Sequence, residues 1–466
     1  MSRNREVAVQ RNGITEGVIW QQILIFFLPI LVGAFLQQLY NTADAMVVGR
    51  FVGTAALSAV GGTTNTILNL IIGFFIGLSS GATVIISQYF GGGDQEEINR
   101  AVHTAIALSL AGGAVLSVLG YIAAPWMLSM LNTPADVMQF AVPYLRIYFA
   151  GTIANLLFNV GSGILRAVGD SKGPLYVLAF CTVLNILLDV VFVAFLGLAT
   201  AGAAIATILS QLCSGLLVFW MVHRKGEMFH LHWKKINLDP ELLMHIFRIG
   251  LPAGMASVMY SLSNLIIQAG VNGFGTMTIA AWTVFGKIDS VFWMIIDSFG
   301  IAVTTFIAQN YGARKMARVK KGIRVCLWMA LIMTVGLSAL LYFFGGPLGV
   351  LFTDDPAVLQ RATELMQFMV KYFFTYVFIA VIPSALRAVG DSLVPTIITG
   401  IGVCGFRALW MLVIAPMLPW QTLESYVCCY QLSWAITSVI FMIYYKKFAP
   451  IREQLDDITK EEEALA

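Results

Sequence analysis

One stretch of this chain occurs twice, and the repeat constrains the fold more than any other feature of the sequence. Residues Leu165–Pro174 read LRAVGDSKGP and residues Leu386–Pro395 read LRAVGDSLVP, so the numbering of the two copies differs by 386 − 165 = 221. Three matches in one order at nearly one period indicate a duplicated half. The other two matches are Ser87–Asp94 with Ala308–Lys315 (308 − 87 = 221) and Leu28-Pro29 with Leu251-Pro252 (251 − 28 = 223).

The composition indicates whether the two halves fold in water or in a membrane. Hydrophobic residues make up 58% of the chain and charged residues 11%, and the mean hydropathy is +0.81. An ordinary soluble domain has roughly 25% charged residues. We therefore predict an integral membrane protein, whose partners are the lipid bilayer and small molecules and not nucleic acid. The six cysteines have no CxxC spacing, which disfavours a disulfide framework or a zinc site.

Twelve apolar runs are near the ~20 residues that cross a bilayer as a helix. The prediction is an all-α, polytopic membrane protein of 12 transmembrane helices in two pseudo-symmetric six-helix lobes, over residues 14–222 and 246–447. A linker over 223–245 and a tail over 448–466 complete the chain. Six spans return the chain to its starting side, so the halves are parallel repeats. The runs are about 18–47, 56–86, 101–125, 138–163, 174–196, 199–222, 246–271, 279–307, 322–344, 363–385, 393–416 and 422–445.

The distribution of Lys and Arg predicts the orientation. If both termini and the even-numbered connections share one side, most basic residues gather there, while the other side has little beyond Arg50. By the positive-inside rule, both termini are predicted to be cytoplasmic, in a plasma (inner) membrane protein. The basic residues on that side include Arg224-Lys225, Lys234-Lys235, Arg314-Lys315, Lys320-Lys321 and Lys446-Lys447.

Ionisable groups inside spans mark functional sites, because they are costly there. Asp189 lies 15 residues beyond Pro174, which places it ~22 Å deep in the fifth span. Asn185 precedes it by four residues and shares its helical face. Thr207 in the sixth span lies at a similar level, and Asp44 ends the first span towards it. These oxygens suit Na⁺ or a proton, although a helix cap at Asp44 and a structural hydrogen bond at Asp189 are the alternative.

The second half has its own charged groups inside spans, namely Lys287, Asp289 and Arg407. Lys287 and Asp289 are two residues apart and point to different faces, so each requires a partner on another helix. We expect Arg407 to pair with Asp289 as a fixed ion pair, with substrate contact as the alternative. The opposite charges four residues apart in each LRAVGDS copy predict two further pairs, Arg166 with Asp170 and Arg387 with Asp391.

These features resemble the multidrug and toxic compound extrusion (MATE) family from about Gly17 to Lys447. The resemblance rests on the duplicated twelve-span pattern, the twin LRAVGDS stretches, NTAD in the first span, GTAALSAVG after it and NILLD in the fifth. It is closest to the DinF-like branch, whose cation site lies in the first lobe. The NorM-like branch has acids in spans seven and ten, where this chain offers Asn264, Gln268 and Glu364. The residues that match the DinF-like cation site are Asp44, Asn185, Asp189 and Thr207.

The resemblance implies a secondary antiporter that exports organic cations or amphipathic drugs in exchange for Na⁺ or H⁺ by alternating access, with no other cofactor. We expect the protein to be a monomer. Polar positions on spans one, four and seven are the candidates for the substrate cavity: Gln37, Asn41, Asn155, Asn159, Asn264 and Gln268. A flippase for a lipid-linked or other amphipathic metabolite is the alternative. An enzyme is disfavoured, because the chain has no Walker A stretch and no HExxH motif.

Overall fold

A computed structural model describes residues 14–225 and 236–447, and every regular element in that part of the chain is helical. The first half contains α1 (Ile19–Phe51), α2 (Thr54–Ser58), η1 (Ala59–Thr63), α3 (Thr64–Gly92), α4 (Gln95–Met130), α5 (Ala135–Ala150), α6 (Thr152–Ala167), α7 (Lys172–Asp189), η2 (Val190–Phe195) and α8 (Ala199–Arg224). The second half contains α9 (Pro240–Asn272), α10 (Thr276–Gly312), α11 (Met316–Gly349), α12 (Pro356–Val370), α13 (Phe373–Ala388), α14 (Leu393–Thr399), η4 (Gly400–Gly405), α15 (Phe406–Leu409), η5 (Trp410–Ile414), α16 (Ala415–Met417), α17 (Leu423–Val427) and α18 (Cys429–Lys447).

The all-α transmembrane fold is confirmed. Within the described residues, ten helical segments are long and apolar enough to cross a membrane, and counting two bent helix pairs as spans gives twelve. The pairs α5–α6 and α12–α13 are bent by 51° and 53° and form the fourth and tenth spans. In the first pair the break falls at Gly151, where an added Cβ would lie 2.3 Å from the Ile208 side chain. Glycine therefore lets α8 approach the bend closely.

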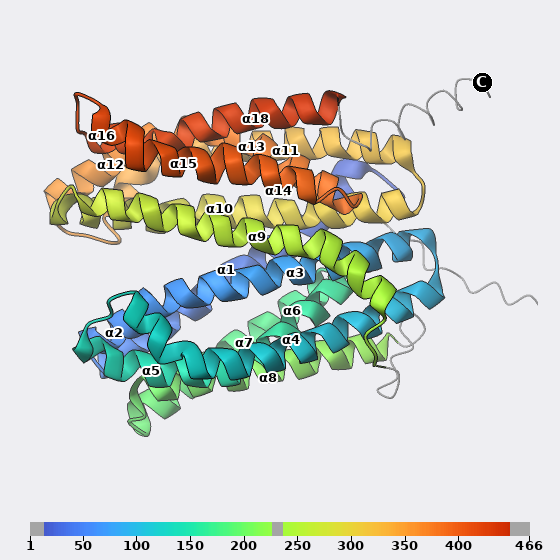
Figure 1. The fold of residues 1–466 in the computed structure, drawn as a ribbon, viewed down its shortest axis with the longest axis horizontal. Coiled ribbons are helices and arrows are strands. Elements are labelled where there is room, and N and C mark those ends of the chain that lie inside the picture. The colour runs from blue at the N-terminus through green and yellow to red at the C-terminus, as the bar shows by residue number, and fades with distance from the viewer. Residues whose placement is uncertain (1–13, 226–235, 448–466) are drawn as a thin grey trace, which may run out of the picture.

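The helices form two bundles that lie one above the other in Figure 1, with α1–α8 in the lower and α9–α18 in the upper. The first helix of each half lies at the boundary and packs against the other half, α1 on α10 and α9 on α3. Phe27 on α1 contacts Phe299 on α10 with ring centroids 4.3 Å apart. On α9, Gly250 approaches α3 so closely that an added Cβ would lie 2.3 Å from the Leu78 carbonyl oxygen. A change in the shape of α1 or α9 would therefore alter a direct contact with the opposite half.

At one end of the molecule, which we call the motif end because both LRAVGDS copies lie there, two hydrogen bonds join the halves. Gln88 Nε2 on α3 donates to the Ala388 carbonyl at 2.7 Å, and Gln309 Nε2 on α10 donates to the Ala167 carbonyl at 2.6 Å. Donors and acceptors are related by the same numerical offset as the LRAVGDS copies (309 − 88 = 388 − 167 = 221), so the duplication built the contact twice. We call this pair of contacts the motif-end latch.

Glycines bring the helices of the latch together. An added Cβ at Gly91 would lie 1.9 Å from the Gln309 carbonyl oxygen, and one at Gly312 would lie 1.8 Å from the Gln88 carbonyl oxygen. These two glycines are also related by the repeat (312 − 91 = 221). Only residues without a side chain allow this separation, so the backbones of α3 and α10 are in direct contact at the motif end.

The segment that leads into each half is bound to the other half. Arg318 on α11 donates to the carbonyls of Ile14, Glu16 and Gly17, which precede α1. Asp239, which caps α9, accepts from Arg100 Nε on α4 at 3.2 Å. Because both lead-in segments cross the boundary, they add to the closure of the motif end. The predicted linker 223–245 and tail 448–466 lie partly and wholly outside the described residues, which omit 226–235 and 448–466.

The two ion pairs predicted within the LRAVGDS copies are not formed. Asp170 instead bonds to Lys225 at the end of α8, with Nζ and Oδ2 2.8 Å apart. Asp391 accepts a hydrogen bond from the Tyr444 hydroxyl on α18 at 2.7 Å. In each half the acid thus connects the turn to the last helix of that half, because the turn faces that helix rather than the preceding arginine.

Candidate functional site

Four side chains predicted to form a cation site come together inside the first half. Asp44 lies on α1, Asn185 and Asp189 lie on α7, and Thr207 lies on α8. Each is at most 5% exposed, and Thr207 Oγ1 donates to Asp44 Oδ2 at 3.2 Å. We call these four residues the first-lobe cluster. The cluster joins α1 to the consecutive helices α7 and α8, more than 120 residues later in the chain. Asp44 lies within α1 and so does not cap the end of that helix.

Local helix geometry aims the α7 side chains into the cluster. Asn185 and Asp189 are four residues apart and lie on one face. Asp189 is the last α-helical residue of α7, and the π-helical segment η2 starts at Val190. Short π-helical segments inside α-helices occur frequently at functional sites. The π-helical segment η2 thus begins directly after Asp189, the carboxylate that α7 contributes to the cluster.

The cluster contains charge without a basic partner. Asp44 is close enough to interact directly with Asp189, Asn185 and Thr207, and no described Lys or Arg forms a salt bridge with either acid. Both Asp189 oxygens and both Asn185 amide atoms have no hydrogen-bond partner among the described residues. Two buried carboxylates at close range favour an arrangement in which a proton or cation neutralises at least one.

The donor set fits a hard monovalent cation or a proton. Two carboxylates, one amide oxygen and one hydroxyl are oxygen ligands, which hard cations prefer. Within the described residues no group of three or more His, Cys, Asp or Glu side chains is placed to hold a metal ion. A transition-metal site is thus not indicated here, while Na⁺ or H⁺ is compatible with the residues present.

A separate cavity of about 800 Å³ lies mainly against the second half. Its wall comes from α9, α10, α12, α13, α14, α15 and α18 of that half, with α3 and α6 of the first. It extends from Trp282 near the start of α10 to Arg166 and Arg387, which directly precede the two carbonyls bonded in the latch. The volume is that of a pocket for a drug-sized molecule, and its far limit is the latch.

Two of the six predicted cavity residues, Asn159 and Asn264, line this cavity, whereas Gln37, Asn41, Asn155 and Gln268 are not among its lining residues. Asn155 accepts from Asn159 Nδ2 at 3.1 Å, and Gln268 donates to Asn272 at 2.8 Å, both within four residues. Those side chains bond within their own helical segments. Two of the six candidates, one from each half, thus line a cavity that lies mainly beside the second half.

The expected Arg407–Asp289 ion pair is not formed. Asp289 Oδ2 accepts from Trp293 Nε1, one turn further along α10, at 2.7 Å. Arg407 Nε donates to Ser433 Oγ at 3.3 Å, and its guanidinium lies 4.1 Å from the Tyr430 ring centroid. Lys287, also predicted to be buried, is exposed. Asp289 and Arg407 both line the cavity, each with its own local partner.

An aromatic cluster on the cavity wall was not predicted from the sequence. Trp293 and Trp434 lie around Tyr376, with ring centroids 5.0 and 5.4 Å from it. Tyr430 lies one turn before Trp434 and contacts it at 5.4 Å. The four-residue spacing of Tyr430 and Trp434 indicates a shared face, but in so apolar a chain most aromatic pairs of this kind face lipid or a neighbouring helix. Nothing in the spacing alone distinguishes the cavity face.

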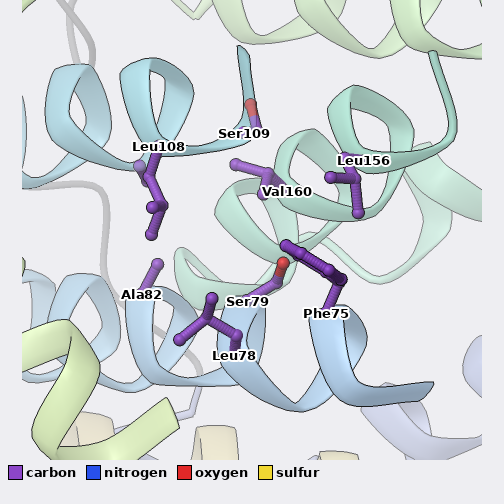
Figure 2. Close-up of a pocket in the computed structure, with 9 residues that line it drawn as sticks. Phe75, Leu78, Ser79, Ala82, Leu108, Ser109, Leu156 and Val160 are labelled. Carbon is purple, nitrogen blue, oxygen red and sulfur yellow. The ribbon is translucent and has the colours of Figure 1, made fainter. Parts of the chain in front are cut away.

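A second, much smaller cavity of about 20 Å³ lies between α3, α4 and α6 (Figure 2). Leu78, Phe75, Leu156 and Val160 surround it, together with the hydroxyls of Ser79 and Ser109. That volume is close to the minimum for one water molecule. This gap is a packing defect inside the first half rather than a substrate site.

Comparison with known proteins relates this arrangement to membrane transporters. The MatE family model matches residues 29–191 and 252–412, two ranges whose starts differ by 252 − 29 = 223 and whose ends differ by 412 − 191 = 221. The probable multidrug resistance protein YoeA of Bacillus subtilis is 30% identical, covering 92% of this chain and 94% of that protein. The FAD transporter of Shewanella oneidensis is 28% identical, covering 75% and 78%.

Solved structures of low sequence identity have the same fold. A multidrug resistance MATE family transporter of the MOP superfamily, described as outward-facing, superposes with a TM-score of 0.85 at 20% identity, covering 97% of this chain and 99% of that one. A MOP superfamily transporter from Pyrococcus furiosus gives a TM-score of 0.86 at 20% identity with the same coverage.

Proposed function

The chain belongs to the MatE family of membrane transporters, which are not enzymes, and from that premise we propose a secondary active antiporter that exports organic cations or amphipathic drugs. The coupling ion is Na⁺ or H⁺. The observation that carries the proposal is the first-lobe cluster, where Asp44 and Asp189 are buried with no basic partner among the described residues. Buried carboxylates of this kind inside a span favour an ion that binds and leaves.

The branch and the substrate class rest on similarity. The four residues of the first-lobe cluster match the DinF-like pattern, and we assign the chain to that branch. Relatives named as multidrug resistance proteins, such as YoeA, support drug export. The aromatic wall of the large cavity also supports drug export, since aromatic side chains line pockets that bind amphipathic small molecules.

We further propose that the motif end faces the cytoplasm, because the Lys and Arg residues gather there. The two lobes then span residues 14–222 and 246–447, with a cytoplasmic linker over 223–245 and a cytoplasmic tail over 448–466. The protein acts as a monomer in the plasma (inner) membrane. Because the large cavity ends at the latch, this conformation is the one closed to the cytoplasm.

Helix α1 provides the route from the ion to the substrate. It carries Asp44 of the first-lobe cluster and Phe27, which packs on Phe299 of α10 in the other half. Asp289 and Trp293 of the cavity wall also lie on α10. A shape change of α1 on ion binding thus reaches the substrate cavity through a direct contact. Coupling follows if ion and substrate favour different states, since equal affinity for both shifts nothing.

A second candidate is export of an amphipathic metabolite, including flipping of a lipid-linked one. The specific observation in its favour is that three arginines, Arg166, Arg387 and Arg407, line the cavity. A relative named as an FAD transporter supports the same class of cargo. The carboxylates of Asp289 and Asp297 on the same wall favour the drug antiporter, because they suit cationic groups.

Efflux of a fluorescent organic cation from cells tests the proposal, with the Na⁺ and H⁺ gradients varied separately. The variant Asp189→Asn removes one carboxylate from the first-lobe cluster with little change of shape, and the matched control Asp136→Asn changes an exposed acid at the start of α5. We expect Asp189→Asn to lose ion-driven efflux and Asp136→Asn to retain it. Equal efflux by all three proteins would contradict the assignment, and the gradient that drives the control identifies the ion.

A further inference from the structure

Arg407 is a buried cation whose charge is not neutralised by the side chains that hold it. Its side chain is 1% exposed, and its described polar partner is the neutral hydroxyl of Ser433. The guanidinium lies over the Tyr430 and Trp434 rings, at 4.1 and 5.8 Å from their centroids. Its Nη2 has no hydrogen-bond partner among the described residues. Cation–π contacts stabilise a cation less than the removal of an ion from water destabilises it.

The backbone around Arg407 is unusual as well. The one turn of α-helix that carries it, α15, lies between the π-helical segments η4 and η5. In the first half the pseudo-equivalent position is 407 − 221 = 186, one residue after Asn185 and three before Asp189. The duplicated halves therefore have an acid, Asp189, close to this position in the first half and a base, Arg407, at this position in the second. If the acids bind a cation, the same place in the second half suits an anion.

The cavity around Arg407 completes a two-part site. Arg407 is part of the wall with Trp293, Tyr376 and Trp434, and the carboxylates of Asp289 and Asp297 lie on α10 of the same wall. No described acid lies within salt-bridge distance of Arg407. The aromatic rings hold the guanidinium in place, and its buried Nη2 has no hydrogen-bond partner among the described residues. The planar fork of a guanidinium matches carboxylate and phosphate oxygens.

We propose that Arg407 is an anion-binding subsite of the large cavity, and that the preferred substrates are flat aromatic molecules bearing a carboxylate or phosphate oxyanion. The oxyanion accepts hydrogen bonds from the guanidinium, while the rings of Trp293 and Tyr376 contact the aromatic body. Any cationic group of the same molecule lies towards Asp289 and Asp297. This inference rests on the proposed function, since it names the substrate class of the same cavity.

Binding of two matched dyes to the full-length protein in detergent tests the subsite: a rhodamine with a free carboxylic acid, and its ethyl ester. The two dyes share one cationic ring system and differ only in the anionic group. In fluorescence polarisation we expect Arg407→Gln to weaken binding of the acid by about tenfold to a hundredfold, as for a charge-assisted hydrogen bond. Binding of the ester is expected to stay within about twofold of the parent.

Three competitors identify the anion. Benzoate and phenyl phosphate are expected to displace the acid dye from the parent protein, whereas benzyl alcohol is not. The more effective of the first two shows whether a carboxylate or a phosphate is preferred. In Arg407→Gln neither anion is expected to compete better than the alcohol.

The outcomes separate this inference from the proposed function. Failure of the parent to bind or export either dye would argue against the drug antiporter itself. Binding of both dyes with an unchanged ratio in Arg407→Gln would overturn the subsite alone. If Arg407→Gln does not fold, Arg407→Lys decides: it retains the charge but loses the planar fork, so a several-fold loss for the acid alone supports the proposal and an unchanged ratio overturns it.

Discussion

The backbone contact at the motif end can be opened by a single methyl group. An alanine Cβ at Gly312 would lie 1.8 Å from the Gln88 carbonyl oxygen, and real Cβ contacts essentially never fall below 3.0 Å. Helices α3 and α10 must therefore move apart until that distance reaches at least 3.0 Å, because the obstructing atom belongs to the backbone and cannot rotate away. Overpacking of this kind costs ~1–3 kcal/mol. A cost borne only by the closed conformation shifts the equilibrium towards the open one by ~5- to 150-fold.

Pulsed electron paramagnetic resonance measures that shift. Spin labels on Glu96→Cys at the start of α4 and Lys320→Cys at the start of α11 report the separation of the two halves at the motif end, since both positions are exposed there. The native cysteines are replaced in this background. Gly336→Ala is the matched control, because a Cβ there meets nothing within 4 Å. We expect a longer-distance population in Gly312→Ala alone. Identical distance distributions for Gly312→Ala and the control would refute the latch.

Two further predictions concern the inter-lobe contacts and the cavity wall. A side-chain hydrogen bond from Arg100 lowers the pKa of Asp239 below its usual range, so this contact adds stability above the unfolded pKa of ~3.9 and loses it as the pH falls through the lower folded pKa. Thermal unfolding in detergent should place the melting temperature of Asp239→Asn below that of the parent at pH ~7, and the difference should vanish once the pH falls below the lowered pKa of folded Asp239. A difference that persists in strong acid would contradict this. Trp293→Ala removes an aromatic ring of the cavity wall that also donates a hydrogen bond to Asp289. Equilibrium binding of both rhodamine dyes should therefore weaken by ~3- to 30-fold. An effect on the acid dye alone would instead indicate that the substitution acts through Arg407.

The overall architecture was predictable because its causes are local and periodic. Runs of apolar residues near the length of a bilayer crossing determine the spans, and the constant offset between the two copies determines their grouping. The same offset later reappears in the Gln88 and Gln309 contacts. The first-lobe cluster was predictable for a related reason, since Asn185 and Asp189 share a helical face and their depth matches that of Thr207.

The cavity was harder to predict, because its position depends on how two halves meet. Asn155 and Gln268 resemble cavity residues in sequence, yet each bonds to a side chain four residues away. Asp289 and Arg407 looked like an ion pair because both charges lie inside spans, but Trp293 and Ser433 satisfy them separately. Which polar group has a closer local partner is decided by side-chain packing, and helical spacing does not contain that information.

The acceptors of the motif-end latch are main-chain oxygens, whereas the donors are side chains, so mutations affect the two ends of each hydrogen bond differently. No amino-acid replacement at Ala167 or Ala388 deletes a carbonyl group, so genetic variation acts on the bonds chiefly through Gln88 and Gln309. Each glutamine belongs to its own copy of the ancestral half and can vary without the other. After the duplication, each of the two inter-half hydrogen bonds could therefore be strengthened or weakened by mutation independently of the other.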